Sequence, residues 1–173
     1  MAILNVEFKA KSDDIEGLES RLLELSPVYI GTDHQIDTYF NVTEGRLKLR
    51  EGNIENSLIW YQRQNTGAAK QSDVLLYPHE PDINLKEILV KLHGIKVIVD
   101  KKRKIYFIGN VKFHFDRVKD LGTFIEVEAI DSTGDIGIDK LKEQCENYAD
   151  MFGIKTADYI AVSYSDLILD LSH

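Results

Sequence analysis

The stretch that decides the fold is Asn5-Val6-Glu7-Phe8-Lys9-Ala10-Lys11, near the start of the chain. Successive side chains of a β-strand point to opposite faces, so the apolar residues of this stretch share one face and its amide and charged residues share the other. Such a strand can lie half-buried with a solvated charged face, or its charged face can line an enclosed polar space. The other strands decide between these two interpretations.

The same alternation returns in later stretches of strand-like composition. Charged or histidine side chains share one face in residues 46–50 (Arg46, Lys48, Arg50), 111–118 (Lys112, His114, Asp116) and 123–130 (Glu126, Glu128). The run Lys101-Lys102-Arg103-Lys104 lies between strand-forming residues and predicts a strand with cations on both faces. Charges sorted by strand favour a closed sheet whose interior places cations suited to phosphates beside carboxylates suited to a divalent cation.

Helices are predicted between the strands, where they would cover the apolar faces. Apolar residues recur at helical spacing in residues 15–25, 84–93 and 138–151, and the ambiguous residues 157–169 predict one more helix. Further strands are predicted over residues 35–40, 57–64, 72–78 and 95–99. Since no linker or repeat divides the sequence, we predict a single α+β domain over residues 1–173.

Composition excludes several classes of protein. The sequence has 173 residues, 43% of them hydrophobic and 29% charged, and it contains no apolar run of the length of a membrane span or signal peptide. We therefore expect a cytoplasmic protein with no membrane partner. The single cysteine, Cys145, excludes an intramolecular disulfide and predicts a small core residue. A net charge of −8 argues against nucleic-acid binding, while lysine and arginine concentrated in the strands favour a compact polyanion.

Seven segments, in this order and spacing, resemble one known family. They are residues 5–9 (NVEFK), 35–40 (QIDTYF), 45–50 (GRLKLR), 61–63 (YQR), 101–103 (KKR) with Tyr106, 115–116 (FD) and 121–128 (LGTFIEVE). The pattern is similar to that of the CYTH family, the triphosphate tunnel metalloenzymes, which include class IV adenylate cyclases, thiamine triphosphatases and inorganic triphosphatases. The resemblance covers nearly the whole chain.

The resemblance implies a closed antiparallel eight-stranded β-tunnel with helices packed outside, and it implies a role for each matching residue. Metal ligands for Mg²⁺ or Mn²⁺ would be Glu7, Glu126 and Glu128. Substrate-binding cations would be Lys9, Lys11, Arg46, Lys48, Arg50, Arg63, Lys101 and Arg103. The catalytic residues would be Lys9, Arg63 and Asp116, with Asp116 beside the metal or orienting the attacking group. His114 is a further candidate for ligand contact.

Two positions depart from the family pattern. Asn5 stands where the signature Glu-x-Glu-x-Lys has its first glutamate, which removes one charge from the metal site and is similar to a class IV cyclase-like branch. Gln62 stands where many members carry lysine before the next cation, so we expect the tunnel to lack one phosphate-binding cation.

The resemblance implies an enzyme acting on a small-molecule triphosphate: ATP, thiamine triphosphate or inorganic triphosphate. A cyclase would convert ATP to cyclic AMP and pyrophosphate, and a triphosphatase would use water in place of the ribose hydroxyl. A third alternative is a non-catalytic module that binds polyphosphate or nucleotide. The sequence leaves these alternatives open, and it leaves open whether the chain forms a homodimer.

Overall fold

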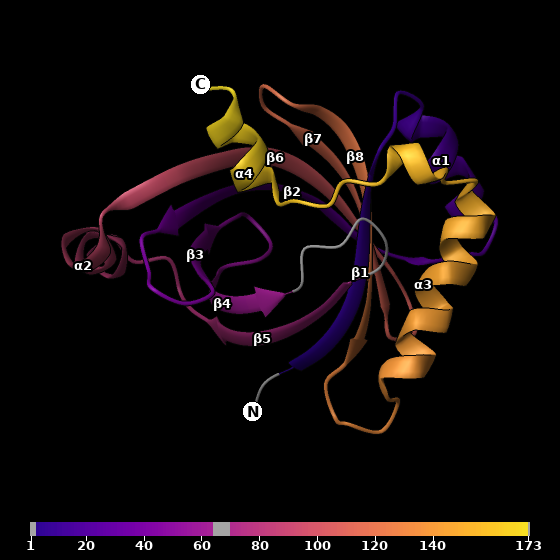
Figure 1. Ribbon diagram of the computed structural model, residues 1–173, viewed down its shortest axis with the longest axis horizontal. Coiled ribbons are helices and arrows are strands. Elements are labelled where there is room, and N and C mark those ends of the chain that lie inside the picture. The colour runs from indigo at the N-terminus through magenta and orange to yellow at the C-terminus, as the bar shows by residue number, and fades with distance from the viewer. Residues whose placement is uncertain (1–2, 64–69, 173) are drawn as a thin grey trace.

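The alternating stretches form the strands of one closed antiparallel sheet (Figure 1). The computed structural model describes residues 3–63 and 70–172, and every element below lies within these ranges. The strands are β1 (Ile3–Lys11), β2 (Val28–Phe40), β3 (Arg46–Glu51), β4 (Ser57–Arg63), β5 (Lys70–Pro78), β6 (Ile95–Ile108), β7 (Val111–Val118) and β8 (Gly122–Asp131). Their order around the sheet is β1-β5-β4-β3-β2-β6-β7-β8, and β8 pairs again with β1. The predicted closed tunnel is therefore confirmed.

The helices lie outside this sheet. They are α1 (Ile15–Leu23), α2 (Ile83–His93), α3 (Ile138–Phe152) and α4 (Tyr164–Asp170), with a short 3₁₀ turn, η1 (Thr156–Asp158). Local sequence signals set their ends: the Asp14 carboxylate accepts a hydrogen bond from the Gly17 amide at the start of α1, and Gly153 ends α3 in the left-handed conformation. No helix of the described ranges is long and apolar enough to cross a membrane.

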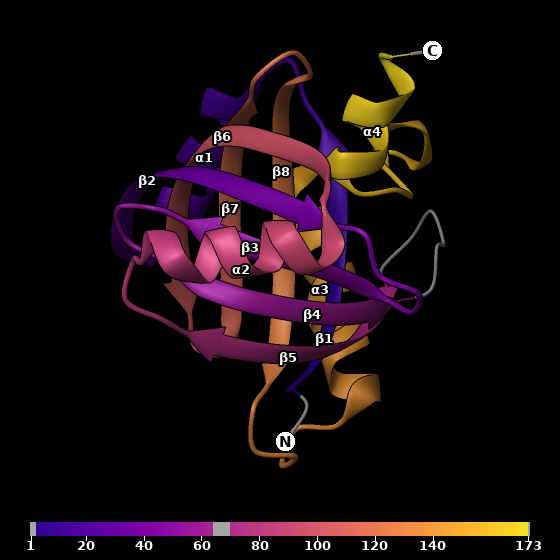
Figure 2. The ribbon, with the colours of Figure 1, turned by 90° about the vertical axis from the view of Figure 1, so that its left-hand side faces the viewer.

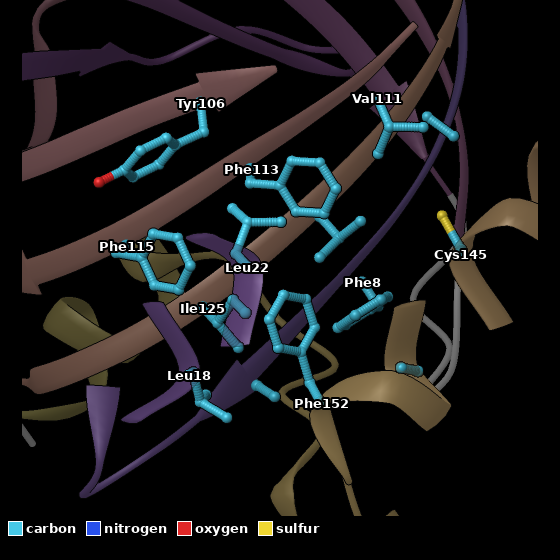
Figure 3. Packing of buried hydrophobic residues seen from close by; sticks show 14 of the residues in the cluster. Phe8, Leu18, Leu22, Tyr106, Val111, Phe113, Phe115, Ile125, Cys145 and Phe152 are labelled. Atoms are coloured by element: carbon cyan, nitrogen blue, oxygen red, sulfur yellow. The ribbon is translucent and has the colours of Figure 1, made fainter. Parts of the chain in front are cut away.

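The larger apolar core lies between the outer face of β1, β7 and β8 and the helices α1 and α3 (Figure 3). In the β1–β8 register Phe8 lies opposite Val127, and Ala10 lies opposite Ile125, so their side chains meet on this outer face. Figure 3 shows Phe152 of α3 packed against the same layer. Burying this apolar layer under helices turns the ionic residues of the same strands toward the interior of the sheet.

A second outer core lies under α2. This helix lies over the outer face of β3, between β2 and β4 (Figure 2), and Leu89 packs with Phe40 and Leu49. Leu47 of β3 joins the same cluster. The prediction that helices cover the apolar faces of the strands is confirmed here for Leu47 and Leu49, which places Lys48 and Arg50 on the inner face.

Three predicted elements differ from the structure. Strand β2 begins at Val28 rather than at residue 35, and residues 95–108 form one continuous strand, since β2 and β6 pair over nearly their whole lengths. The predicted helix over residues 157–169 is wrong in its first half. There the Ile160 amide donates to the Lys9 carbonyl, so this segment continues the sheet beside β1 beyond the end of the β1–β5 pairing.

Candidate active site: a tunnel with an ionic wall and an apolar wall

The interior of the closed sheet holds a cavity of about 380 Å³ that receives side chains from all of the strands. In this strand order β1 and β8 lie across the interior from β2 and β3, and β4 and β5 lie across from β6 and β7. We call its charged lining the ionic wall: Glu7, Lys9, Asp37, Lys48, Arg50, Lys101, Arg103, Lys112, His114, Glu126 and Glu128. We call the patch made by Ile59, Tyr61, Val74 and Leu76 the apolar wall.

Asp37 is the centre of the cationic part of the ionic wall. Its carboxylate accepts hydrogen bonds from Arg50 Nε at 2.9 Å and Lys101 Nζ at 2.7 Å, and Lys48 Nζ lies 3.5 Å away. Burial raises the pKa of Asp37, but the cations lower it by more, so this pKa lies well below its usual range. Burial lowers the pKa of Lys101 to about 7 despite the neighbouring Asp37. Asp37 thus positions three cationic side chains, whose combined positive charge exceeds its own negative charge.

Arg103 is fixed by a second buried carboxylate. Its guanidinium donates to both oxygens of Asp116, at 2.8 and 2.7 Å, and the Tyr164 hydroxyl donates to Asp116 at 2.7 Å. Asp116 is fully buried and does not belong to the described residues that line the cavity, whereas Arg103 does. In this geometry Asp116 orients Arg103. The catalytic role of Asp116 that the resemblance implies stays a prediction.

The carboxylates gather on β1 and β8. Glu7 lies opposite Glu128 in register, and Lys9 lies opposite Glu126. Burial and the neighbouring Glu7 raise the pKa of Glu128. Burial also raises the pKa of Glu126, but the neighbouring His114 and the charges of Arg103 and Lys9 lower it well below its usual range. The two β8 carboxylates therefore differ in their tendency to hold a proton.

Asn5 lies beside these carboxylates. It lines the cavity, and its Nδ2 donates to Glu128 Oε1 at 2.5 Å. Because the amide donates where the family has a charged glutamate, Asn5 stabilises the ionised form of Glu128 and adds no negative charge. The hydrogen bond to Glu128 is a role for Asn5 that the sequence did not predict.

His114 lies between the carboxylates and the cations, and its side chain is only 2% exposed. Burial and, to a smaller extent, the charge of Arg103 lower the pKa of His114 to about 4, although Glu126 opposes both. The ligand atoms of His114, Glu126 and Glu128 all lie within 4.8 Å of one another. These three residues are a compact donor set for a cation.

Glu55 was not predicted from the sequence, because it lies in a loop and belongs to no alternating strand. The fully buried Asp33 accepts the backbone amides of Asn53, Ile54 and Glu55 at 2.8 to 2.9 Å and holds this loop at the tunnel. The Glu55 carboxylate then lines the cavity and pairs with Lys112. It thereby neutralises part of the ionic wall.

The apolar wall is built from two cross-strand pairs. Ile59 lies opposite Leu76, and Tyr61 lies opposite Val74, on the inner face of β4 and β5. Tyr39 of β2 lines the same cavity. A contiguous apolar and aromatic surface inside a polar tunnel is suited to an organic group, because it offers phosphates no partner.

The start of α4 lies at the tunnel, since Ser163 and Tyr164 line the cavity. Arg46 donates to both oxygens of Asp166, at 2.9 and 2.8 Å, and to the Ser163 hydroxyl at 2.9 Å. Tyr164 at the start of α4 packs on Phe124 with ring centroids 5.0 Å apart, and Lys9 Nζ lies 4.1 Å from the Tyr164 ring centroid. Arg46 therefore anchors the helix at the tunnel.

The structure brings most of the predicted site residues together. Among the described residues, those that line the one cavity are Glu7, Lys9, Lys48, Arg50, Lys101, Arg103, Glu126 and Glu128. Lys11 is exposed at the end of β1, and neither Lys11 nor Arg46 lines this cavity. Arg63 belongs to β4, but its side chain lies outside the described residues. Gln62 is exposed on the outer face, so the expectation that it costs the tunnel a cation is wrong: a lysine there would point away from the cavity.

The chain is similar to known proteins over nearly its whole length. The family model described as "CYTH domain" matches residues 4–164. The adenylate cyclase CyaB of Aeromonas hydrophila is 25% identical over 171 residues, which cover 94% of this chain and 87% of that protein. The solved structure of the PH1012 protein of Pyrococcus horikoshii is 22% identical with a TM-score of 0.76, and it covers 94% of this chain and 98% of that one. HpAC1 of Hippeastrum, reported to have a dominant triphosphatase activity, is 15% identical with a TM-score of 0.63, covering 99% and 96% of the two chains.

Proposed function

The chain belongs to the CYTH domain family, and from that premise we propose that it is a divalent-metal-dependent enzyme that converts ATP to cyclic AMP and pyrophosphate. The observation that carries this proposal is the division of one cavity into an ionic wall and an apolar wall. The ionic wall is suited to a triphosphate, and the apolar wall is suited to a nucleoside. Inorganic triphosphate would leave the apolar wall without a partner.

The ionic wall supports binding of the phosphates. Lys48, Arg50, Lys101 and Arg103 are positioned by the buried carboxylates of Asp37 and Asp116, so they need little reorganisation when an anion arrives. Cations that are fixed before the substrate arrives stabilise the charge that develops on a leaving pyrophosphate.

The carboxylate cluster supports a divalent cation. Glu7, Glu126 and Glu128 offer the oxygen donors that Mg²⁺ or Mn²⁺ binds, and Glu126 and Glu128 lie within reach of one ion. A cation bound there supplies neutralisation of phosphate oxygens. The chain's own contribution is to keep these carboxylates beside Lys9 and Arg103, so that metal and phosphates meet in the same part of the tunnel.

The apolar wall supports the choice of ATP. With the base and ribose against Ile59 and Leu76, the triphosphate would extend toward Lys101 and Arg103 on the opposite strands. The ribose 3′-oxygen then attacks the α-phosphorus and gives up its hydroxyl proton to solvent, the bond from the α-phosphorus to the bridging oxygen breaks, and pyrophosphate leaves. The residues hold the two ends of one substrate in fixed positions, which favours attack within the molecule.

The test is product analysis with ATP, thiamine triphosphate and inorganic triphosphate, each with Mg²⁺ and with Mn²⁺. We expect cyclic AMP and pyrophosphate from ATP. Lys101→Met should abolish this turnover, whereas Lys102→Met, whose side chain is exposed on the opposite face of β6, should leave it unchanged. Phosphate release instead of cyclic AMP would identify a triphosphatase, and stabilisation by ligand without turnover would identify a binding module.

A further inference from the structure

His114 is a buried histidine whose ring nitrogens have no hydrogen-bond partner within the part of the chain that the structure describes. The residue is 1% exposed and lines the cavity. Glu126 Oε1 lies 3.6 Å from Nδ1, which is too long for a hydrogen bond. Leaving buried polar atoms unpaired costs free energy, so such a group in a folded protein needs a partner of another kind.

The surroundings of His114 indicate what that partner is. His114 lies opposite Glu126 in the β7–β8 register, and Lys112, two residues earlier on β7, lies opposite Glu128. One ligand atom from each of His114, Glu126 and Glu128 falls within 4.8 Å of the other two. Ligands on opposite sides of a first-row transition ion lie about 4 Å apart, since each metal–ligand bond is about 2 Å long. The three side chains need to close only slightly to share one ion.

We propose that His114 supplies a nitrogen ligand to the cation held by Glu126 and Glu128, and that this ligand makes the site select a first-row transition ion such as Mn²⁺ over Mg²⁺. The proposal rests on the metal dependence proposed above. Magnesium takes oxygen ligands and loses its water reluctantly, whereas imidazole is a good ligand for the transition ions. The departure at position 5 acts in the same direction, because Asn5 removes the charged oxygen that would favour a hard cation.

The test uses the whole protein loaded with Mn²⁺ alone, without substrate. Electron spin echo envelope modulation should show nitrogen-14 coupling from a directly bound imidazole, and calorimetry should give tighter binding of Mn²⁺ than of Mg²⁺. In His114→Gln the nitrogen signal should disappear and Mn²⁺ affinity should fall by about tenfold or more, with a smaller change for Mg²⁺. His34→Gln, which alters an exposed histidine paired with Asp100 outside the tunnel, should change neither.

The outcomes distinguish the nitrogen ligand from the metal dependence on which it rests. Bound Mn²⁺ without nitrogen-14 coupling, or equal losses for both ions in His114→Gln, would overturn the nitrogen ligand while leaving a metal-dependent enzyme in place. Failure of the wild-type protein to bind either ion would overturn both proposals. The spectrum of the wild-type protein answers the question even if His114→Gln does not fold.

Discussion

The ionic wall and the apolar wall are built from the same kind of strand, but they are held together in different ways. In the ionic wall buried carboxylates fix three of the cations: Asp37 holds Arg50 and Lys101, and Asp116 holds Arg103. In the apolar wall Ile59 lies opposite Leu76, and Tyr61 lies opposite Val74, across the β4–β5 pair. The ionic wall is therefore specific in position and costly to damage, whereas the apolar wall tolerates change and offers surface to a ligand.

The largest effect is expected from Asp37→Ala. Removing this carboxylate leaves Arg50, Lys101 and Lys48 without their shared partner in a buried site, and breaking a buried ion pair costs about 3–5 kcal/mol. The free energy of unfolding, measured by denaturant titration, should fall by about this amount. Inorganic triphosphate should restore part of the loss, because it supplies the missing negative charge.

Asp100→Ala is the matched control for Asp37→Ala. Asp100 pairs with His34 on the outside, where both side chains are substantially exposed, and such pairs contribute about 0–1 kcal/mol. If Asp37→Ala cost no more than Asp100→Ala, the cations would not depend on their carboxylate, and the contrast between the two walls would disappear.

The next largest effect is expected from Arg50→Ala. Losing one charged hydrogen bond to an extended anion should weaken binding of inorganic triphosphate by about 1.5–3 kcal/mol, a factor of about 10 to 150. Phosphate, which cannot reach the full row of cations, should lose less. Calorimetry on both ligands measures the difference, and Arg117→Ala, an exposed arginine paired with Glu16, serves as the control. Equal losses for both ligands would argue against a dedicated triphosphate site.

The sequence predicted the ionic wall and the closed sheet for the same physical reason. Charges sorted by strand, with apolar residues between them, are incompatible with a sheet whose two faces are both solvated. Alternation therefore separated Val6 and Phe8 from Glu7 and Lys9, whereas the closed tunnel that encloses the charged face also required the pattern of the other strands and the family resemblance. The particular pairing of Asp37 with Lys101 did not follow, because it depends on the β2–β6 register.

The apolar wall was not predicted as part of the site. Ile59 and Tyr61 alternate with Leu58 and Trp60, so neither face of β4 is marked as polar, and the sequence does not show which face is inside. Glu55 was missed because a loop residue follows no period. Arg46 was placed with the substrate because it shares a face with Lys48 and Arg50, although it lies at the strand end and binds Asp166 instead.

A smaller effect on the ionic wall is expected from pH. Burial lowers the pKa of Lys101 to about 7. Inorganic triphosphate prefers the charged amine, so its affinity should fall about tenfold between pH 6 and pH 8 as the free protein loses this proton. Lys101→Arg stays charged across this range, and the ratio of the two affinities removes the titration of the ligand itself. A ratio that did not change with pH would show that Lys101 is charged throughout.

The lowered pKa of Lys101 also affects stability. Rising pH should raise the free energy of unfolding, whereas it lowers the affinity for triphosphate. Above the lowered pKa of Lys101 the unfolded chain binds this proton and the folded chain does not, so the free energy of unfolding gains with rising pH between about 7 and 10.5. Lys101→Arg should remove this gain. Denaturant titrations of both proteins across that range measure it.

The smallest effect, and the one that tests the apolar wall directly, is expected from a pair of neighbouring leucines. Leu75 and Leu76 are both 46% exposed on β5, but only Leu76 lines the cavity, because successive residues of a strand face opposite sides. If the nucleoside packs on the apolar wall, Leu76→Ala should weaken ATP binding by about 1 kcal/mol, roughly fivefold, through the apolar area that is lost. It should leave the affinity for inorganic triphosphate unchanged, and Leu75→Ala should change the affinity for neither ligand.

The two substitutions remove the same atoms at the same exposure, so their cost to folding should be similar. Any difference in ATP affinity measured by calorimetry is then due to the contact that is lost inside the tunnel. Weakening of both ligands by Leu76→Ala would mean that the substitution disturbs the ionic wall across the cavity. Unchanged ATP binding in both variants would place the nucleoside outside the apolar wall, and the preference for ATP over inorganic triphosphate would then lose its structural basis.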